Sequence, residues 1–310
     1  MRDAKLPLLP RRGNAVAAPA TIGVDLAGAD VAQRSLFAAC ERVASSMPVA
    51  LRCYHSSTLP SSSLVECRRC SDVISMEDEA LSAVRKKKNS SLVQAIQDLK
   101  QGEISALVTC ANTGAVTAAA VVYLKRFRGL HHPSLIASLP LPGGTVIALD
   151  MGAFVTATAK DLVAYAFLGR AYAITSGISK PRVGLLNIGR EAGRGTSELR
   201  QADETLRACP HITYIGNIEP EDVFAGRVDV LATSGFAGNI FLKTAEAAAK
   251  RSSQLSYTPS GALLAGVRGV VIKCHGSGSD QAISAAIAQA KTAVEQRIVE
   301  KLETLFCGSI

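Results

Sequence analysis

The sequence predicts an α/β fold in which helices cover a mostly parallel sheet. Short apolar runs rich in β-branched residues alternate with longer helical patterns along almost the whole chain. The strand candidates are nearly continuously apolar, which is typical of strands buried on both faces. Aromatic residues make up only 5% of the chain and Trp is absent. Small aliphatic side chains must therefore fill the interior, which suits layered sheets and helices.

The pattern of apolar residues places the elements along the chain. Strands are expected at residues 21–27, 49–54, 106–110, 135–139, 145–150, 182–188, 213–218, 228–233 and 270–274. Helices are expected at residues 31–46, 77–87, 92–101, 115–126, 161–176, 197–209, 240–251 and 281–305. Ser91 and Gln94 predict a capping box for the third helix, and Asn239 and Ser279 stand at expected N-cap positions.

The last expected helix carries a long apolar stripe at helical spacing. It runs from Ile283 through Ile287, Ala290, Val294, Ile298 and Leu302 to Leu305. The stripe predicts either packing against the core or a dimer seam, because it is longer than most globular helices need.

Composition and charge limit the class of protein. The 310 residues are 48% hydrophobic and 19% charged, as in a folded enzyme. We expect residues 1–20 to form a disordered arm and residues 21–310 a single two-lobed α/β domain. The net charge of +8 favours anionic partners. Nucleic acid is not expected, because no helix-turn-helix signature, zinc-finger spacing or aromatic-basic alternation is present.

Localisation and metal content follow from what the sequence lacks. No apolar run is long enough to cross a membrane, so a cytoplasmic protein with at most weak membrane association is expected. The eight cysteines are scattered and are expected to be reduced thiols. Cys67 and Cys70 form one C-x-x-C pair without two further ligands, so neither a metal nor another cofactor is expected.

Four strand-to-helix turns combine glycine with neutral hydrogen-bond donors. They are residues 112–115, 150–153, 234–239 and 275–278. Ligands in such sheets bind at the carboxyl ends of strands, so we expect the turns to converge on one edge and bind an anion or oxyanion. Nucleotide-binding glycine motifs and a G-x-S-x-G elbow are absent. The chemistry would then rest on positioning and electrostatics.

The motifs around these turns resemble one family. Residues 181–189 read PRVGLLNIG, residues 235–239 read GFAGN and residues 266–277 read GVRGVVIKCHGS. Together with residues 25–30, 85–91, 112–115 and 214–219, they resemble the bacterial acyl-carrier-protein:phosphate acyltransferases, the PlsX family. The resemblance covers roughly residues 21–310.

The resemblance implies a three-layer α/β/α sandwich like that of the phosphotransacetylases, a homodimer, and no metal or organic cofactor. It implies that inorganic phosphate attacks the thioester of a long-chain acyl-acyl carrier protein, giving acyl phosphate and free carrier for phospholipid synthesis. A downstream membrane acyltransferase is a further expected partner. The positive charge suits both phosphate and an acidic carrier protein.

Site residues follow from that chemistry as hypotheses. Asn112, Thr113 and the Gly114 N–H are expected to cradle phosphate, and Asn239 to donate to the oxyanion. His275 either protonates the leaving thiolate, donates to phosphate, or is a structural histidine. The remaining candidates are Gly152, Gly238 and Ser277 for phosphate, Arg194 and Lys243 as cations, and Arg85, Lys86, Lys87 and Lys88 for docking the carrier. For Lys243 and the basic run, a solvated surface is the alternative.

Several positions depart from the family pattern. Phe154 stands where the family has Asn, Arg190 interrupts an acidic stretch, and Arg194 stands where Lys is expected. A short Ser-rich link replaces the helical hairpin expected between Lys250 and Gly261, which makes membrane attachment less expected. Two alternatives stay open: a coenzyme A-dependent phosphotransacetylase-like enzyme, and a degenerate binding protein without catalysis.

Overall fold

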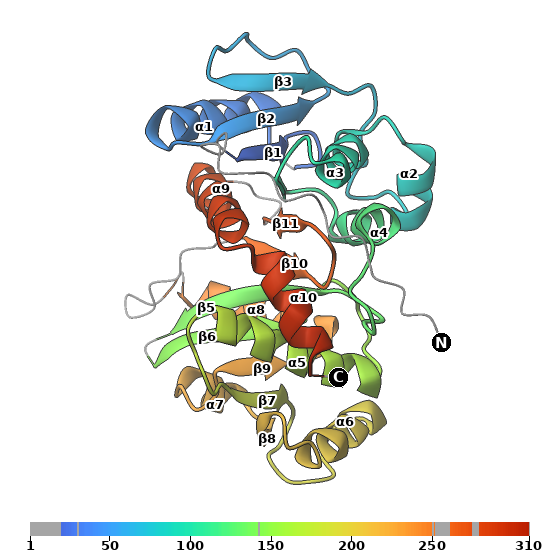
Figure 1. Cartoon of the computed structure of the whole chain (residues 1–310), viewed down its shortest axis with the longest axis vertical. Coiled ribbons are helices and arrows are strands. Elements are labelled where there is room, and N and C mark those ends of the chain that lie inside the picture. Colours follow the sequence, from blue (N-terminus) through green and yellow to red (C-terminus); the bar gives the residue numbers. More distant parts are fainter. Residues whose placement is uncertain are drawn as a thin grey trace, which may run out of the picture.

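The computed structural model describes residues 20–29, 31–141, 143–249, 251, 261–274 and 279–309. Within these residues eleven strands form one continuous sheet in the order β3-β2-β1-β4-β11-β10-β5-β6-β9-β7-β8 (Figure 1). The strands are β1 Thr21–Asp25, β2 Ala50–His55, β3 Val65–Arg69, β4 Ala106–Thr109, β5 Ser134–Leu141, β6 Gly144–Leu149, β7 Arg182–Leu186, β8 Thr213–Ile218, β9 Val230–Ala232, β10 Ala262–Ala265 and β11 Val270–Lys273. Almost all of the expected N-terminal arm lies outside the described residues.

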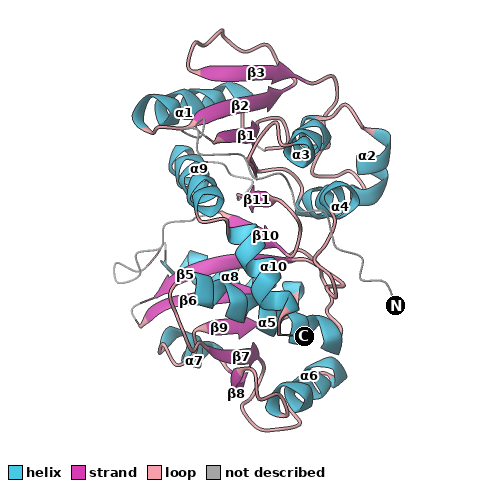
Figure 2. Ribbon diagram, in the orientation of Figure 1, coloured by secondary structure: helices cyan, strands magenta, loops and turns pink. Residues whose placement is uncertain are grey.

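Helices cover both faces of this sheet (Figure 2). They are α1 Gln33–Ser46, α2 Ala80–Lys86, α3 Ser91–Gln101, α4 Thr113–Leu124, α5 Ala159–Thr175, α6 Ser197–Arg207, α7 Pro220–Phe224, α8 Gly235–Ala249, α9 Asp280–Glu295 and α10 Ile298–Cys307. One core lies under α1, α5, α6, α9 and α10, and the other lies under α2, α3, α4, α7 and α8. The expected three-layer α/β/α sandwich is therefore confirmed.

Strand direction divides the sheet into two blocks. Strands β3, β2, β1, β4 and β11 are mutually parallel, and so are β6, β9, β7 and β8. Three antiparallel pairings, β11 with β10, β10 with β5 and β5 with β6, lie between the blocks. An odd number of reversals makes the blocks run in opposite directions, so their carboxyl ends lie at opposite edges of the sheet. The expectation that four turns converge on one edge is wrong.

Short connections cause the reversal. Only residues 142–143 join β5 to β6, and residues 266–269 join β10 to β11. A parallel crossover needs a dozen or more residues, so each of these pairs must be a hairpin.

The apolar stripe at the end of the chain belongs to the core. Ile283, Ile287, Ala290, Ile298 and Leu302 are buried in the core under α9 and α10. The helix expected across residues 281–305 breaks at Arg297, whose φ of 53° lies in the left-handed region. Core packing therefore explains the stripe.

In the described part of the chain, no helix is long and apolar enough to cross a membrane.

Helix starts differ from expectation at two of three positions. Ser90, not Ser91, occupies the N-cap of α3 without a side-chain cap, and Gln94 instead bonds to the Lys88 carbonyl and Arg68. Asn239 lies inside α8, which begins four residues earlier at Gly235. Ser279 does cap α9, because its hydroxyl accepts from the Ala282 N–H.

Candidate active site

The first candidate site lies at the carboxyl ends of β1 and β4. Asp25, which ends β1, is buried and accepts hydrogen bonds from the Thr109 hydroxyl at 3.0 Å and the Ala27 N–H at 3.2 Å. Burial raises the pKa of Asp25. A Cβ on Gly28 would lie 2.4 Å from the Ala111 Cβ, so only glycine allows the two turns to pack directly on each other. Asp25 thus holds the turns in register.

Asn112 caps α4 at this edge. Its Oδ1 accepts from the Ala115 N–H at 3.2 Å, and its Nδ2 donates to the Met76 carbonyl at 2.8 Å. Both ends of the amide are therefore used inside the protein. Within the described residues no hydrogen bond occupies the N–H groups of Thr113 and Gly114, and at a helix start such donors suit an anion.

The start of α2 packs beside the start of α4, since a Cβ on Gly114 would lie 3.1 Å from the Ala80 Cβ, and the basic run lies at the other end of α2. Arg85, Lys86 and Lys88 are exposed. Lys87 is half-buried and donates to Asp78 at 2.7 Å and to the Val73 carbonyl at 2.9 Å. Three of the four basic residues are therefore open to a partner, and Lys87 instead supports the fold.

His275 and Ser277 follow β11, which is the strand beside β4. The Cys274 N–H donates to the Thr109 carbonyl at 2.8 Å, so the chain leaves β11 at the edge where Asn112 lies. His275 and Ser277 themselves lie outside the described residues.

The second cluster lies at the opposite edge, after β6. Asp150 is buried and accepts from the N–H groups of Leu135, Ala153 and Phe154 at 2.8, 3.0 and 2.9 Å. Burial raises the pKa of Asp150. The carboxylate fixes the turn and keeps its backbone N–H groups occupied, so this turn is less open to an anion than that of Asn112.

The start of α8 packs on this turn through glycines. A Cβ on Gly238 would lie 2.0 Å from the Asp150 carbonyl oxygen, and one on Gly152 would lie 3.0 Å from Asn239 Nδ2. Gly152 also has a φ of 114°, which favours glycine. The structure therefore brings Gly152, Gly238 and Asn239 together, whereas Lys243 is exposed further along α8.

The loop after β7 shows how two departures from the family pattern are accommodated. Arg190 pairs with Asp222 at 2.8 Å and lies 3.5 Å from Glu219 and 3.7 Å from Glu221. It thereby ties the loop to the acidic start of α7. Arg194 is exposed and pairs with Glu191 at 3.2 Å.

An apolar groove of about 750 Å³ runs along α8, the helix that begins at the second cluster. Its walls include Phe224, Phe236, Ile240, Ala245 and Ala248. Phe236 and Ile240 are 62% and 52% exposed. The volume is in the range of small-molecule sites, and the lining suits a hydrocarbon. We did not predict this groove from the sequence, because its residues read as the apolar face of an ordinary helix.

Among the described residues no hydrogen bond links the turn of Asn112 to the cluster of Asp150, Gly152 and Asn239. Asn112, Thr113 and Gly114 thus form one group, and Asn239, Gly152 and Gly238 form another.

The α/β/α fold is similar to that of the phosphotransacylases. The structure superposes on a branched-chain phosphotransacylase from Enterococcus faecalis with a TM-score of 0.65 at 14% identity, covering 92% of this chain and 99% of that one. It superposes on the EutD phosphotransacetylase from Staphylococcus aureus with a TM-score of 0.60 at 17% identity, covering 90% and 94%. These likenesses establish the fold.

Sequence similarity is more specific. Residues 20–256 match a family described as fatty acid synthesis protein. A phosphate acyltransferase of Exiguobacterium sp. is 39% identical over 265 residues, which cover 75% of this chain and 80% of that protein. One from Staphylococcus aureus is 34% identical over 271 residues, covering 77% and 83%. The chain belongs to this fatty acid synthesis protein family, and the resemblance seen in its motifs is confirmed.

Proposed function

We propose that the chain is a phosphate acyltransferase that moves a long acyl chain from acyl carrier protein to inorganic phosphate, for phospholipid synthesis. Its relatedness to phosphate acyltransferases over most of its length carries the proposal. The open N–H groups at the start of α4 support it, because they suit a phosphate dianion without any metal.

Phosphate binds at the first cluster in this proposal. The N–H groups of Thr113 and Gly114 hold it, Asn112 caps the helix that presents them, and His275 and Ser277 add donors from β11. The carrier docks through Arg85, Lys86 and Lys88, at the end of the helix whose start packs beside the start of α4. The carrier's thioester is thereby delivered close to the phosphate.

The acyl chain lies in the groove beside α8. Each buried methylene contributes about 0.8 kcal/mol, so this groove favours long chains over an acetyl group. Asn239, on the same helix and beside Gly152, donates to the thioester oxygen as negative charge develops there. Arg194 and Lys243 supply positive charge at this cluster.

A homodimer completes the reaction site. One chain places the phosphate cluster and the acyl cluster at opposite sheet edges, and transfer requires the reacting atoms to be about 3–3.5 Å apart. We therefore propose that one protomer supplies the phosphate cluster and its partner the acyl cluster. At low phosphate concentration, mixing Asn112→Asp with Asn239→Ala protomers should give activity well above that of either variant alone. Failure of co-refolded mixtures to recover activity would place both clusters in one chain.

Coenzyme A thioesters are the alternative acyl donors, and the phosphotransacetylase-like fold is the observation that favours them. An assay with palmitoyl-acyl carrier protein and palmitoyl-coenzyme A, at equal concentrations with phosphate, separates the two. We expect faster release of free carrier than of coenzyme A. Equal rates, or a preference for acetyl-coenzyme A, would contradict the proposed substrate. A folded protein that releases neither would be the degenerate binding protein.

A further inference from the structure

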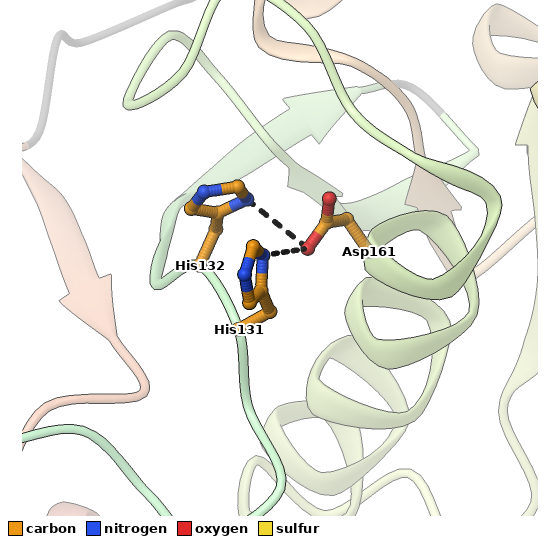
Figure 3. Close-up of side chains that lie close together, drawn as sticks. All are labelled: His131, His132 and Asp161. Atoms are coloured by element: carbon orange, nitrogen blue, oxygen red, sulfur yellow. Dashed lines mark ion pairs between the residues drawn. The ribbon is translucent and has the colours of Figure 1, made fainter.

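Two histidines and an aspartate meet beside the second cluster (Figure 3). His131 and His132 precede β5, and Asp161 lies in the first turn of α5. The Oδ1 atom of Asp161 lies 3.8 Å from His131 Nδ1 and 3.1 Å from His132 Nδ1. Three ligand-type atoms from two distant parts of the sequence therefore face one point.

The two oxygens of Asp161 have different surroundings. Oδ2 accepts from the Thr158 N–H at 2.9 Å and from the Thr158 hydroxyl at 2.7 Å, which completes the capping box of α5. Oδ1 is buried, and no aligned hydrogen bond reaches it from the described part of the chain. His132 Nδ1 is also buried, and no aligned hydrogen bond reaches it from the described residues. The Asp161 side chain is only 1% exposed, and its Oδ1 faces the two histidine nitrogens without an aligned hydrogen bond, which is costly for buried polar atoms.

A bound cation resolves both atoms at once. We propose that His131 Nδ1, His132 Nδ1 and Asp161 Oδ1 bind a divalent transition-metal ion, with Zn²⁺ the best match. The ligand atoms lie within 4.8 Å of one another, and a small rotation of the exposed His131 would bring each to about 2.0–2.2 Å from one ion. A set of two imidazoles and one carboxylate favours Zn²⁺ over Mg²⁺ or Ca²⁺, which prefer oxygen ligands. A three-ligand set leaves at least one coordination position open.

The surrounding residues hold the ligands in place. The Arg126 guanidinium donates to the His131 carbonyl and fixes the loop after α4. The Phe154 ring lies against the His132 ring with 4.3 Å between centroids. Supporting contacts of this kind orient metal ligands in proteins. Phe154 thus has a role here, at a position where the family resemblance led us to expect an amide.

The bound ion would link three segments. It would join the loop after α4 to the start of α5, and through Phe154 to the turn of Asp150. Metal binding should therefore raise the thermal stability of the protein in addition to producing a binding signal.

Zinc binding by untagged protein tests the proposal. We would titrate Zn²⁺ against a competing chromophoric chelator and compare wild type with His131→Gln, His132→Gln and Asp161→Asn. We expect one ion per chain and at least a tenfold loss of affinity, roughly, in each variant. His131→Gln is decisive, because His131 is 71% exposed and its replacement leaves the core untouched. The exposed His211, outside the cluster, provides the matched control His211→Gln.

Cobalt spectra and melting curves complete the test. Co²⁺ should give ligand-field bands of a nitrogen and oxygen site, and Zn²⁺ should raise the Tm of wild type but not of His131→Gln. A thiolate-to-cobalt charge-transfer band would place the metal on cysteines and overturn the proposal. Equal Zn²⁺ affinity in His131→Gln and His211→Gln would overturn it as well.

Discussion

At the scale of single residues, the Asn112 side chain caps α4, while the backbone N–H groups that follow it remain available for binding. The sequence led us to expect its amide to contact phosphate, but the amide is used by Ala115 and Met76. The backbone donors of Thr113 and Gly114 are what the cap leaves open. A substitution that preserves the cap should therefore have a small effect unless it adds charge.

We predict that Asn112→Ser keeps most activity, whereas Asn112→Asp weakens phosphate binding. Ser and Asp both cap helices well, so each variant should lose only the bond to the Met76 carbonyl, and the two should have similar stability. An aspartate beside bound phosphate adds repulsion of about 1–4 kcal/mol, which corresponds to roughly fivefold or more in the KM for phosphate. Initial rates against phosphate concentration measure this. Equal KM values for the two variants would remove phosphate from the start of α4.

At the scale of elements, the loop after β7 is joined to α7 by charge. Asp222 is buried and contacts Arg190 at 2.8 Å, Arg227 at 2.6 Å and the Glu219 N–H at 3.1 Å. Burial alone would raise the pKa of Asp222, but the bonds from Arg190 and Arg227 lower it to about 2. The folded protein therefore holds this proton less tightly than the unfolded chain does.

This shift predicts a pH dependence of stability. Asp222 should stabilise the fold fully above its ordinary pKa of 3.8, and lose this effect as the pH falls towards about 2. Asp222→Asn should lower the free energy of unfolding near pH 7, with the difference from wild type shrinking below pH 4. Urea unfolding of both proteins across this range gives the difference. If the difference in the free energy of unfolding stayed constant with pH, the charge of Asp222 would not be what stabilises the fold.

The groove beside α8 gives a second prediction at this scale. Ala248 lines the groove, while its exposed neighbour Ala247 does not. Ala248→Phe should shorten the preferred acyl chain, with kcat/KM falling about fourfold for each methylene excluded. Ala247→Phe is the control and should leave the chain-length profile unchanged. An unchanged profile in Ala248→Phe would place the acyl chain elsewhere.

Most elements were predictable from the sequence because most strands are apolar throughout. β3 was missed because its burial is that of an exposed edge strand, with Glu66 and Arg69 facing solvent. The reversal of the second block was missed although a signal existed. The strands expected at residues 135–139 and 145–150 are separated by too few residues for a crossover, and that spacing alone predicts a hairpin. The pairing of His131 and His132 with Asp161 depends on tertiary contact, and only the consecutive histidines hinted at it.

At the scale of the whole molecule, the two blocks of the sheet carry different parts of the proposed site. The block from β3 to β11 carries the start of α4 and the basic end of α2, and the block from β6 to β8 carries the groove. Figure 1 shows the blocks in the upper and lower halves of the molecule, joined by β10, β5 and the C-terminal helices. A carrier should therefore recognise one half of the surface only.

We predict that Lys86→Glu raises the KM for acyl carrier protein, while Lys180→Glu does not. Both lysines are exposed and both changes alter the net charge equally, but Lys180 lies before β7 in the other half. The effect of Lys86→Glu should be several-fold at low salt and shrink as salt screens the charges. Equal effects of the two changes would indicate general steering without a docking site.

Phosphate-dependent formation of acyl hydroxamate tests the central claim most directly. Purified protein is incubated with palmitoyl-acyl carrier protein and hydroxylamine, with and without inorganic phosphate, because hydroxylamine also reacts slowly with the thioester itself. If the chain is a phosphate acyltransferase, hydroxamate forms much faster with phosphate, and at the rate at which free carrier appears. Hydroxamate formation by folded protein that does not depend on phosphate would contradict the account.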